Sequence, residues 1–96
     1  MTSIFIIGRG ESSDIQIKEP SISRRHLEVC LIDNFIYIAD LKTTNGTYLL
    51  TKQGFQRFDS GTVELTDKLA LGDHVLSVQQ LLELIHSQFT EIQQTA

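Results

Sequence analysis

Short apolar segments separated by turn-forming residues run along most of this 96-residue chain. They are rich in β-branched and aromatic residues, return about every 8–12 residues or sooner, and end at breaks containing Gly, Asn, Asp or Ser. This pattern predicts an all-β sandwich or barrel. Strands are expected at residues 3–7, 14–17, 26–32, 35–41, 46–50, 54–58, 62–65, 68–71 and 74–79.

The period of the pattern changes near the C-terminus, where residues 79–94 predict an amphipathic helix of about four turns. Its apolar positions at helical spacing are Leu81, Leu82, Ile85, Phe89 and Ile92. We therefore expect a β domain at residues 1–80 and a helix at residues 81–96 that packs on the domain or extends from it. A small sandwich can leave part of such a stripe uncovered, so this helix is a candidate homodimer or partner surface.

Length and composition indicate one small domain, because 41% hydrophobic residues in 96 positions are enough for a single core. The chain has no apolar run long enough to cross a membrane, and its start does not read as a signal peptide, so we expect a cytoplasmic protein without membrane contact. The single cysteine, Cys30, forms neither an internal disulfide nor a metal site. We predict no metal and no cofactor.

The net charge of −4 argues against nucleic-acid binding. The charge is unevenly distributed, however. Residues 1–58 hold seven Lys and Arg against six Asp and Glu, whereas residues 59–96 hold one against six. An anion site, if the chain has one, is therefore expected within the first 58 residues.

Ser23 and His26 lie close enough in sequence to touch across a turn, which raises the question of a hydrolase. A nucleophile elbow of the G-x-S-x-G type does not surround Ser23, and the chain has no Ser-x-x-Lys pattern. His26 begins a predicted strand, where an imidazole can brace the preceding loop by bonding a backbone or hydroxyl group. We predict no catalytic residue. The stretch Gly8-Arg9-Gly10 also lacks the phosphate-loop pattern of nucleotide-binding proteins.

Three loops between predicted strands carry donors that suit a phosphate. Gly8-Arg9 forms the first, residues 21–26 the second and residues 43–47 the third. They offer guanidinium, hydroxyl and amide groups, and a phosphomonoester presents three acceptor oxygens and about two negative charges. Loops held by a rigid scaffold are common places for binding residues.

Together these loops resemble the forkhead-associated (FHA) domain family, over most of the chain from about Ile4 to Val78. The resemblance rests on Gly8-Arg9, then Ser23-x-x-His26, then Asp40-Leu41-x-Thr43-Thr44-Asn45-Gly46-Thr47, in that order. It implies an eleven-stranded β-sandwich of the SMAD/FHA type, here with a C-terminal α-helix. It also implies binding of phosphothreonine peptides through loops at one end of the sandwich.

The resemblance assigns a role to each matching residue. The phosphate-binding residues are expected to be Arg9, Ser23, Arg24 and Thr44, with Arg24 contributing its backbone N–H. Asn45 is expected to hold the peptide backbone next to the phosphothreonine. The residues expected to shape the loops are Gly8, His26 and Gly46.

Two positions depart from the family pattern. Many members place an asparagine-glycine pair a few residues after the third loop, where this chain has Tyr48 to Gly54 without the asparagine. Ser21 occupies a position that is often basic. These departures bear on contacts beyond the phosphothreonine.

The resulting hypothesis is a signalling module, not an enzyme, that recognises a partner phosphorylated by a Ser/Thr protein kinase. That partner is expected to be the kinase itself or one of its substrates. The alternative is a scaffold or oligomerisation protein with the same fold that acts without phosphate, through the C-terminal helix or an edge strand. A hydrolase using Ser23 and His26 is the least favoured of the three.

Overall fold

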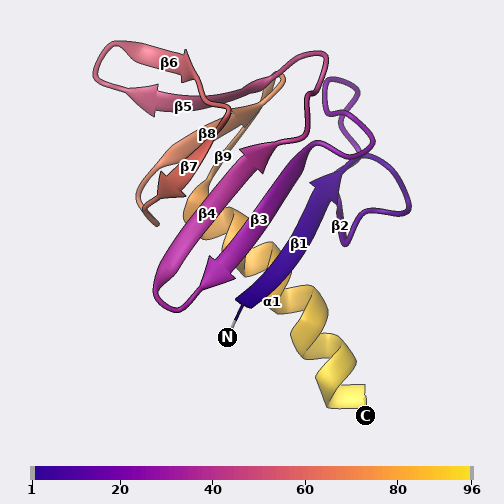
Figure 1. Cartoon of the computed structure of the whole chain (residues 1–96). Coiled ribbons are helices and arrows are strands. Elements are labelled where there is room, and N and C mark those ends of the chain that lie inside the picture. Colours follow the sequence, from indigo (N-terminus) through magenta and orange to yellow (C-terminus); the bar gives the residue numbers. More distant parts are fainter. Residues whose placement is uncertain (1, 96) are drawn as a thin grey trace.

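A computed structural model describes residues 2–95, with side chains described for residues 2–88. Nine strands form two sheets, and one helix follows them (Figure 1). The strands are β1 (Thr2–Gly8), β2 (Ile15–Gln16), β3 (Leu27–Ile32), β4 (Phe35–Asp40), β5 (Thr47–Thr51), β6 (Gly54–Arg57), β7 (Ser60–Val63), β8 (Lys68–Leu71) and β9 (His74–Ser77), and the helix is α1 (Val78–Thr95).

The five-stranded sheet has the order β2-β1-β3-β4-β7 and the four-stranded sheet the order β6-β5-β8-β9. All neighbours are antiparallel except β1 and β2. Strands β3 and β4 form a two-residue hairpin in which Ile32 pairs with Phe35 and Asp33 adopts a φ of 53°. Asp tolerates this left-handed conformation, which matches the twist of the hairpin.

The all-β sandwich with a C-terminal helix is confirmed, and each of the nine strands expected from the apolar pattern is present. Residues 2–95 hold nine strands, whereas the family resemblance implied eleven. The expected strand at 74–79 was too long, because the helix already begins at Val78. The side chains of Phe89 and Ile92, and all of Ala96, lie outside the described residues.

A capping box explains this early start of the helix. The Ser77 hydroxyl accepts a hydrogen bond from the Gln80 N–H at 3.0 Å, and the Gln80 side chain accepts one from the Ser77 N–H at 2.8 Å. Two backbone donors at the helix N-terminus are thereby satisfied reciprocally. The Ser-x-x-Gln spacing is visible in the sequence and outweighs the strand propensity of Val78.

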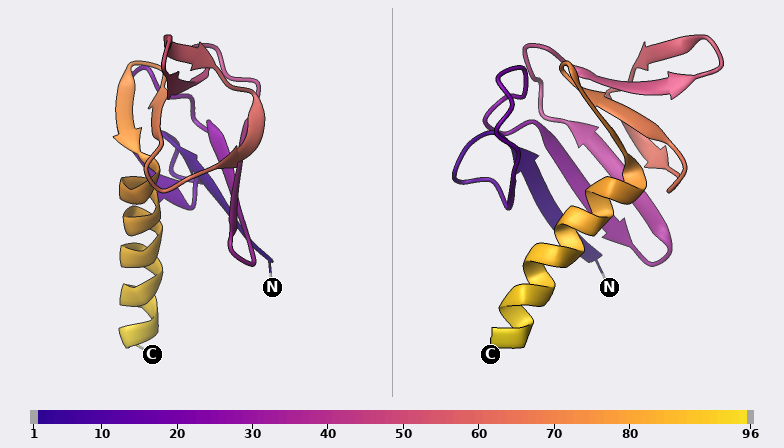
Figure 2. Two further views of the ribbon diagram at one scale, coloured as in Figure 1. Left: turned by 90° about the vertical axis from the view of Figure 1, so that its left-hand side faces the viewer. Right: turned by 180° about the vertical axis from the view of Figure 1, so that it is seen from behind.

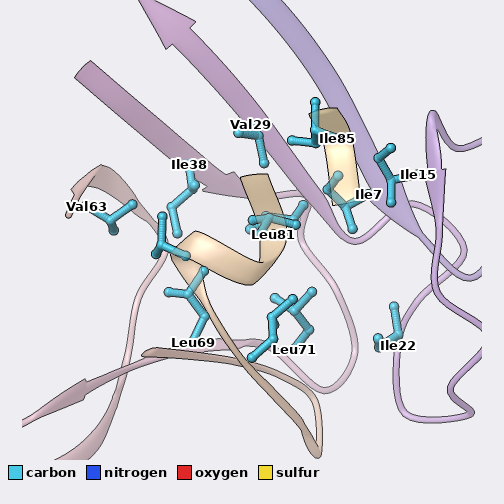
Figure 3. Packing of buried hydrophobic residues seen from close by; sticks show 13 residues of the cluster. Ile7, Ile15, Ile22, Val29, Ile38, Val63, Leu69, Leu71, Leu81 and Ile85 are labelled. Carbon is cyan, nitrogen blue, oxygen red and sulfur yellow. The ribbon is translucent and has the colours of Figure 1, made fainter. Parts of the chain in front are cut away.

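One hydrophobic core lies between the two sheets and the first turns of α1. Figure 3 shows Leu81 and Ile85 of the helix pointing into the same cluster as Ile7, Val29 and Ile38 of the five-stranded sheet. The helix therefore packs on the inner side of β1 and β3 (Figure 2, right). Across residues 2–95, no helix combines the length and apolar character that spanning a bilayer requires.

The fold brings its longer loops to one end. The segments after β1, before β3 and between β4 and β5 emerge together at the upper right of Figure 1, opposite the β3–β4 hairpin. The β8–β9 turn reaches the same end, because the Gly72 N–H donates to the Gly46 carbonyl at 3.0 Å. All three candidate loops thus meet at one edge of the sandwich.

The capping box yields a stability prediction. Replacing Ser77 by alanine is expected to lower the free energy of unfolding by about 1 kcal/mol, because the Gln80 N–H loses its acceptor. Urea-induced unfolding followed by circular dichroism measures the change. Ser87→Ala, at an exposed position inside the same helix, is the matched control and is expected to be neutral. Equal effects of the two substitutions would contradict the capping role.

Candidate functional site

Backbone hydrogen bonds join the first loop to the second. The Arg9 N–H donates to the Ser23 carbonyl at 2.9 Å, and the Gly10 N–H donates to the Arg24 carbonyl at 3.0 Å. This pairing fixes Arg9 beside Ser23, although 14 positions separate them in the sequence. Gly8 makes the approach possible, because a Cβ atom there would collide with the Arg24 carbonyl.

His26 links the second loop to the third through both ring nitrogens. Nδ1 accepts a hydrogen bond from the Ser23 N–H at 3.0 Å, so the ring proton must lie on Nε2. Nε2 then donates to the Gly46 carbonyl at 3.0 Å. The side chain is completely buried. Burial lowers the pKa of His26 below its ordinary value, and the Gly46 carbonyl and the Asp40 carboxylate oppose this shift only partly.

Asp40 organises the third loop from the end of β4. Its carboxylate accepts hydrogen bonds from the Thr43 N–H at 3.0 Å, the Thr43 hydroxyl at 2.7 Å and the Thr47 hydroxyl at 2.8 Å. The Thr43 hydroxyl in turn accepts from the Gly46 N–H at 3.0 Å. Burial opposes ionisation of Asp40, but these donors outweigh it and hold the pKa of the carboxyl below its ordinary value.

The tip of the third loop is fixed on both sides of Thr44. Thr43 is held by Asp40, and the Asn45 side-chain amide donates to the Ser21 carbonyl at 2.9 Å. Gly46 completes the turn with a φ of 83°, a conformation that glycine adopts without strain. Thr44 and Asn45 therefore stand exposed at a rigid tip that is tied to the second loop.

Several donors of the three loops face solvent at this end. The Arg9 side chain is exposed, and its Nε donates to the Ile22 carbonyl at 2.9 Å, which orients the guanidinium and leaves both terminal nitrogens available. Among the described residues, the Ser23 and Thr44 hydroxyls and the Arg24 N–H have no hydrogen-bond partner. Unpaired donors on a rigid frame suit a multiply charged oxyanion.

Comparison with known proteins shows the family to which the chain belongs. The family model of the FHA domain matches residues 5–72. The chain belongs to the FHA domain family. FHA domain-containing protein FhaA of Mycobacterium tuberculosis is 43% identical over 42 residues, which are 44% of this chain and 8% of FhaA. The chain thus spans a small fraction of that relative.

Solved FHA domains share the fold. One, from work on phosphothreonine-dependent FHA domain interactions, has 28% identity and a TM-score of 0.70, covering 78% of this chain and 74% of that chain. The FhaA FHA domain in complex with the intracellular domain of Rv3910 has 29% identity and a TM-score of 0.66, covering 76% of each chain. The FHA domain of CT664 from Chlamydia trachomatis has 28% identity and a TM-score of 0.68, covering 76% of this chain and 72% of that chain.

Sequence reasoning placed the eight candidate residues of this FHA domain on the loops but missed the residues that support them. Asp40 and Thr47 were noticed only as parts of a motif, although their contacts with Thr43 shape the third loop. The Asp-x-x-Thr spacing is typical of a turn in which the aspartate side chain accepts a hydrogen bond from a nearby backbone N–H. This spacing was the signal in the sequence that could have indicated the role of Asp40. Ser21 had no such signal, because its partners Asn45 and Asp73 are distant in sequence.

The buried, neutral His26 makes the stability of this FHA domain depend on pH. The unfolded chain binds a proton at His26 below pH 6.5, whereas the folded domain resists it because the pKa is lowered. The contribution of neutral His26 is therefore full above pH 6.5 and is lost as the pH falls toward the lowered pKa. Nuclear magnetic resonance titration of the imidazole measures the folded value directly. A midpoint at or above 6.5 would refute the expected shift.

Proposed function

We propose that this FHA domain binds phosphothreonine-containing peptides through the end of the sandwich where the three loops meet. The observation that carries the proposal is the hydrogen-bonded frame around His26, which holds Arg9, Ser23 and Thr44 on one rigid edge. Charged donors fixed before binding lose little entropy when the phosphate arrives, so they favour affinity. The related FHA domains with phosphothreonine-dependent interactions support the same function.

Each residue has a proposed part in binding. The two terminal guanidinium nitrogens of Arg9 contact phosphate oxygens, and the planar group allows two parallel hydrogen bonds. The hydroxyls of Ser23 and Thr44 and the N–H of Arg24 donate to the same group. Asn45 already uses one amide N–H on Ser21, so its carbonyl oxygen and its second N–H remain for the peptide backbone.

We propose further that the domain is a binding module without catalysis. A hydrolase would need His26 to take the proton of the Ser23 hydroxyl. Nδ1 instead accepts from the Ser23 backbone N–H, and Nε2 donates to the Gly46 carbonyl. Neither nitrogen is left to act as a base, which supports a structural role for His26.

The proposed partner is a Ser/Thr protein kinase or one of its substrates, because such kinases generate phosphothreonine. The proposed location is the cytoplasm, where ATP-dependent phosphorylation by such kinases takes place. The relatives support a protein partner, since the FhaA FHA domain was solved in complex with an intracellular domain of another protein.

Self-association through α1 is the alternative function. Leu84 is 39% exposed and lines a hollow of about 440 Å³ with Val75, which is 52% exposed on β9. Removing the whole helix would damage the core, because Leu81 and Ile85 are buried. Leu84→Ser is the sharper test. If sedimentation velocity shows a wild-type dimer that this substitution dissociates, and phosphopeptides do not bind, the scaffold function is favoured.

The decisive experiment is titration of the protein with a phosphothreonine peptide library. The library is tested in three forms that differ only in one residue: phosphothreonine, phosphoserine and unmodified threonine. We expect binding of the phosphothreonine form, weaker binding of the phosphoserine form and no binding of the unmodified form. Equal capture of the modified and unmodified forms, or no binding at millimolar concentration, would refute the proposed function.

A further inference from the structure

The outer face of the five-stranded sheet is apolar where a sandwich strand normally turns polar residues to water. Strand β1 contains the run Ile4-Phe5-Ile6-Ile7, which does not alternate. The register places Ile4 beside Cys30, and Cys30 beside Tyr37, in one outward-facing row. In the next outward row Ile32 lies beside Phe35.

These side chains remain exposed in the folded domain. Phe35 is 65% exposed, Ile4 56%, Ile32 40% and Tyr37 37%. Figure 1 views β1, β3 and β4 from this side, with α1 behind them, and within the described part of the chain no strand or helix lies over the face. We call these four residues the outer apolar face. Large exposed apolar patches on monomers are commonly interaction sites.

A hollow of about 650 Å³ connects the outer apolar face to the phosphate-binding end. Tyr37 lines it from the outer apolar face, Ala39 from the same strand, and Thr43 from the loop whose tip is Thr44. Its wall carries two exposed cations, Lys42 and Arg57, and two carboxylates, of which Asp59 lies 3.7 Å from Arg57. Arg57 also lies against the same loop, because a Cβ atom on Gly46 would be 3.2 Å from its guanidinium carbon. The hollow is therefore a path from the phosphothreonine to the apolar face.

We propose that the phosphorylated partner binds in two parts, and this inference rests on the proposed function. The phosphothreonine occupies the loop end, and an apolar segment of the same partner chain covers the outer apolar face. The residues between them pass through the hollow, where cations and carboxylates together favour polar side chains. Continuity between the hollow and the loops is the reason for preferring this occupant to a second copy of the domain.

Strand geometry sets the length of the linking segment. Tyr37 lies three residues before Asp40, the last residue of β4, which is about 10 Å at roughly 3.3 Å per residue. Ile4 lies two strands further across the sheet, another ~10 Å. Thr44 lies four residues beyond Asp40, which adds up to ~13 Å. An extended peptide therefore needs about four to ten residues between its phosphothreonine and the apolar side chains.

Two oriented peptide libraries test this proposal with the full chain. Each has one fixed phosphothreonine and twelve degenerate positions, placed after it in one library and before it in the other. We expect wild-type protein to enrich Leu, Ile, Phe or Tyr about four to ten residues from the phosphothreonine in one library. The double variant Ile4→Thr/Phe35→Thr, which keeps strand-forming residues, is expected to lose this enrichment and to bind the selected peptide at least about tenfold more weakly.

Val75→Thr is the matched control, because Val75 is 52% exposed on the other sheet. This variant is expected to enrich the same apolar residues from the libraries as the wild-type protein does. If the double variant unfolds, the single variants Ile4→Thr and Phe35→Thr are tested with the same libraries in its place. A peptide truncated to three residues on each side of the phosphothreonine should bind wild type and double variant equally.

Three results would overturn the proposal: no apolar enrichment by wild type, unchanged enrichment by the variants, or a wild-type dimer that these substitutions dissociate in sedimentation velocity. If the truncated phosphopeptide still binds, any of these results overturns only the two-part binding and leaves the proposed function standing. If the truncated phosphopeptide does not bind, the proposed function itself is refuted.

Discussion

Replacing Arg9 by alanine is expected to weaken phosphothreonine-peptide binding about ten- to hundredfold. The substitution removes the terminal nitrogens proposed to contact the phosphate, and a hydrogen bond to a charged group contributes about 1.5–3 kcal/mol. Because Arg9 is exposed and its backbone bond to Ser23 persists in the variant, the fold should remain intact. Isothermal titration calorimetry with a phosphothreonine peptide measures the loss.

Two companion variants separate geometry from charge. Arg9→Lys keeps the positive charge but loses the planar fork and the Nε bond to the Ile22 carbonyl, so we expect only partial recovery. Arg25→Ala removes the same charge from an exposed neighbour with no assigned contact and is expected to change affinity less than about threefold. If Arg25→Ala and Arg9→Ala weaken binding equally, the phosphate is attracted by general charge and the assigned contact is wrong.

Local pattern was sufficient to predict the strands and the order of the loops. Alternation of apolar residues and the Asp33-Asn34 turn follow from neighbours in sequence, and the family motifs identified the loops. The supporting contacts could not be predicted in this way. The Ser21 carbonyl accepts a hydrogen bond from the Asn45 side chain, and the Ser21 hydroxyl accepts one from the Asp73 N–H. Both donors come from loops that are distant in sequence, so the local pattern around Ser21 does not indicate these contacts.

For the outer apolar face, in contrast, the sequence did contain a local signal, but no conclusion about this face was drawn from it. The unbroken run from Ile4 to Ile7 suits a strand covered on both faces. In the folded domain only Ile7 of these four is fully buried. The register with β3 and β4 was needed to show that Ile4, Phe35 and Tyr37 gather on one side.

Replacing His26 by alanine is expected to have the largest effect on the fold. The Ser23 N–H would lose its acceptor, and the Gly46 carbonyl would keep only the Gly72 N–H of its two donors. An unsatisfied polar group costs about 1–3 kcal/mol, and the cavity left by the buried ring adds to this cost. A domain of this size commonly has about 5–15 kcal/mol of stability, so partial unfolding is expected. Urea unfolding measures this change, and His74→Ala, at a half-buried position on β9, is the control with a small expected effect.

Two amide substitutions divide the role of His26 between its nitrogens. Asn can place an acceptor near the position of Nδ1 and keep the Ser23 N–H bonded, whereas Gln can place a donor near Nε2 and keep the Gly46 carbonyl bonded. Both variants should be more stable than His26→Ala. Phosphopeptide affinity should be better preserved in His26→Asn, because that variant holds the loop carrying the Ser23 hydroxyl and the Arg24 N–H. If affinity is instead the same in both amide variants at equal folded fraction, His26 supports the fold without positioning the phosphate donors.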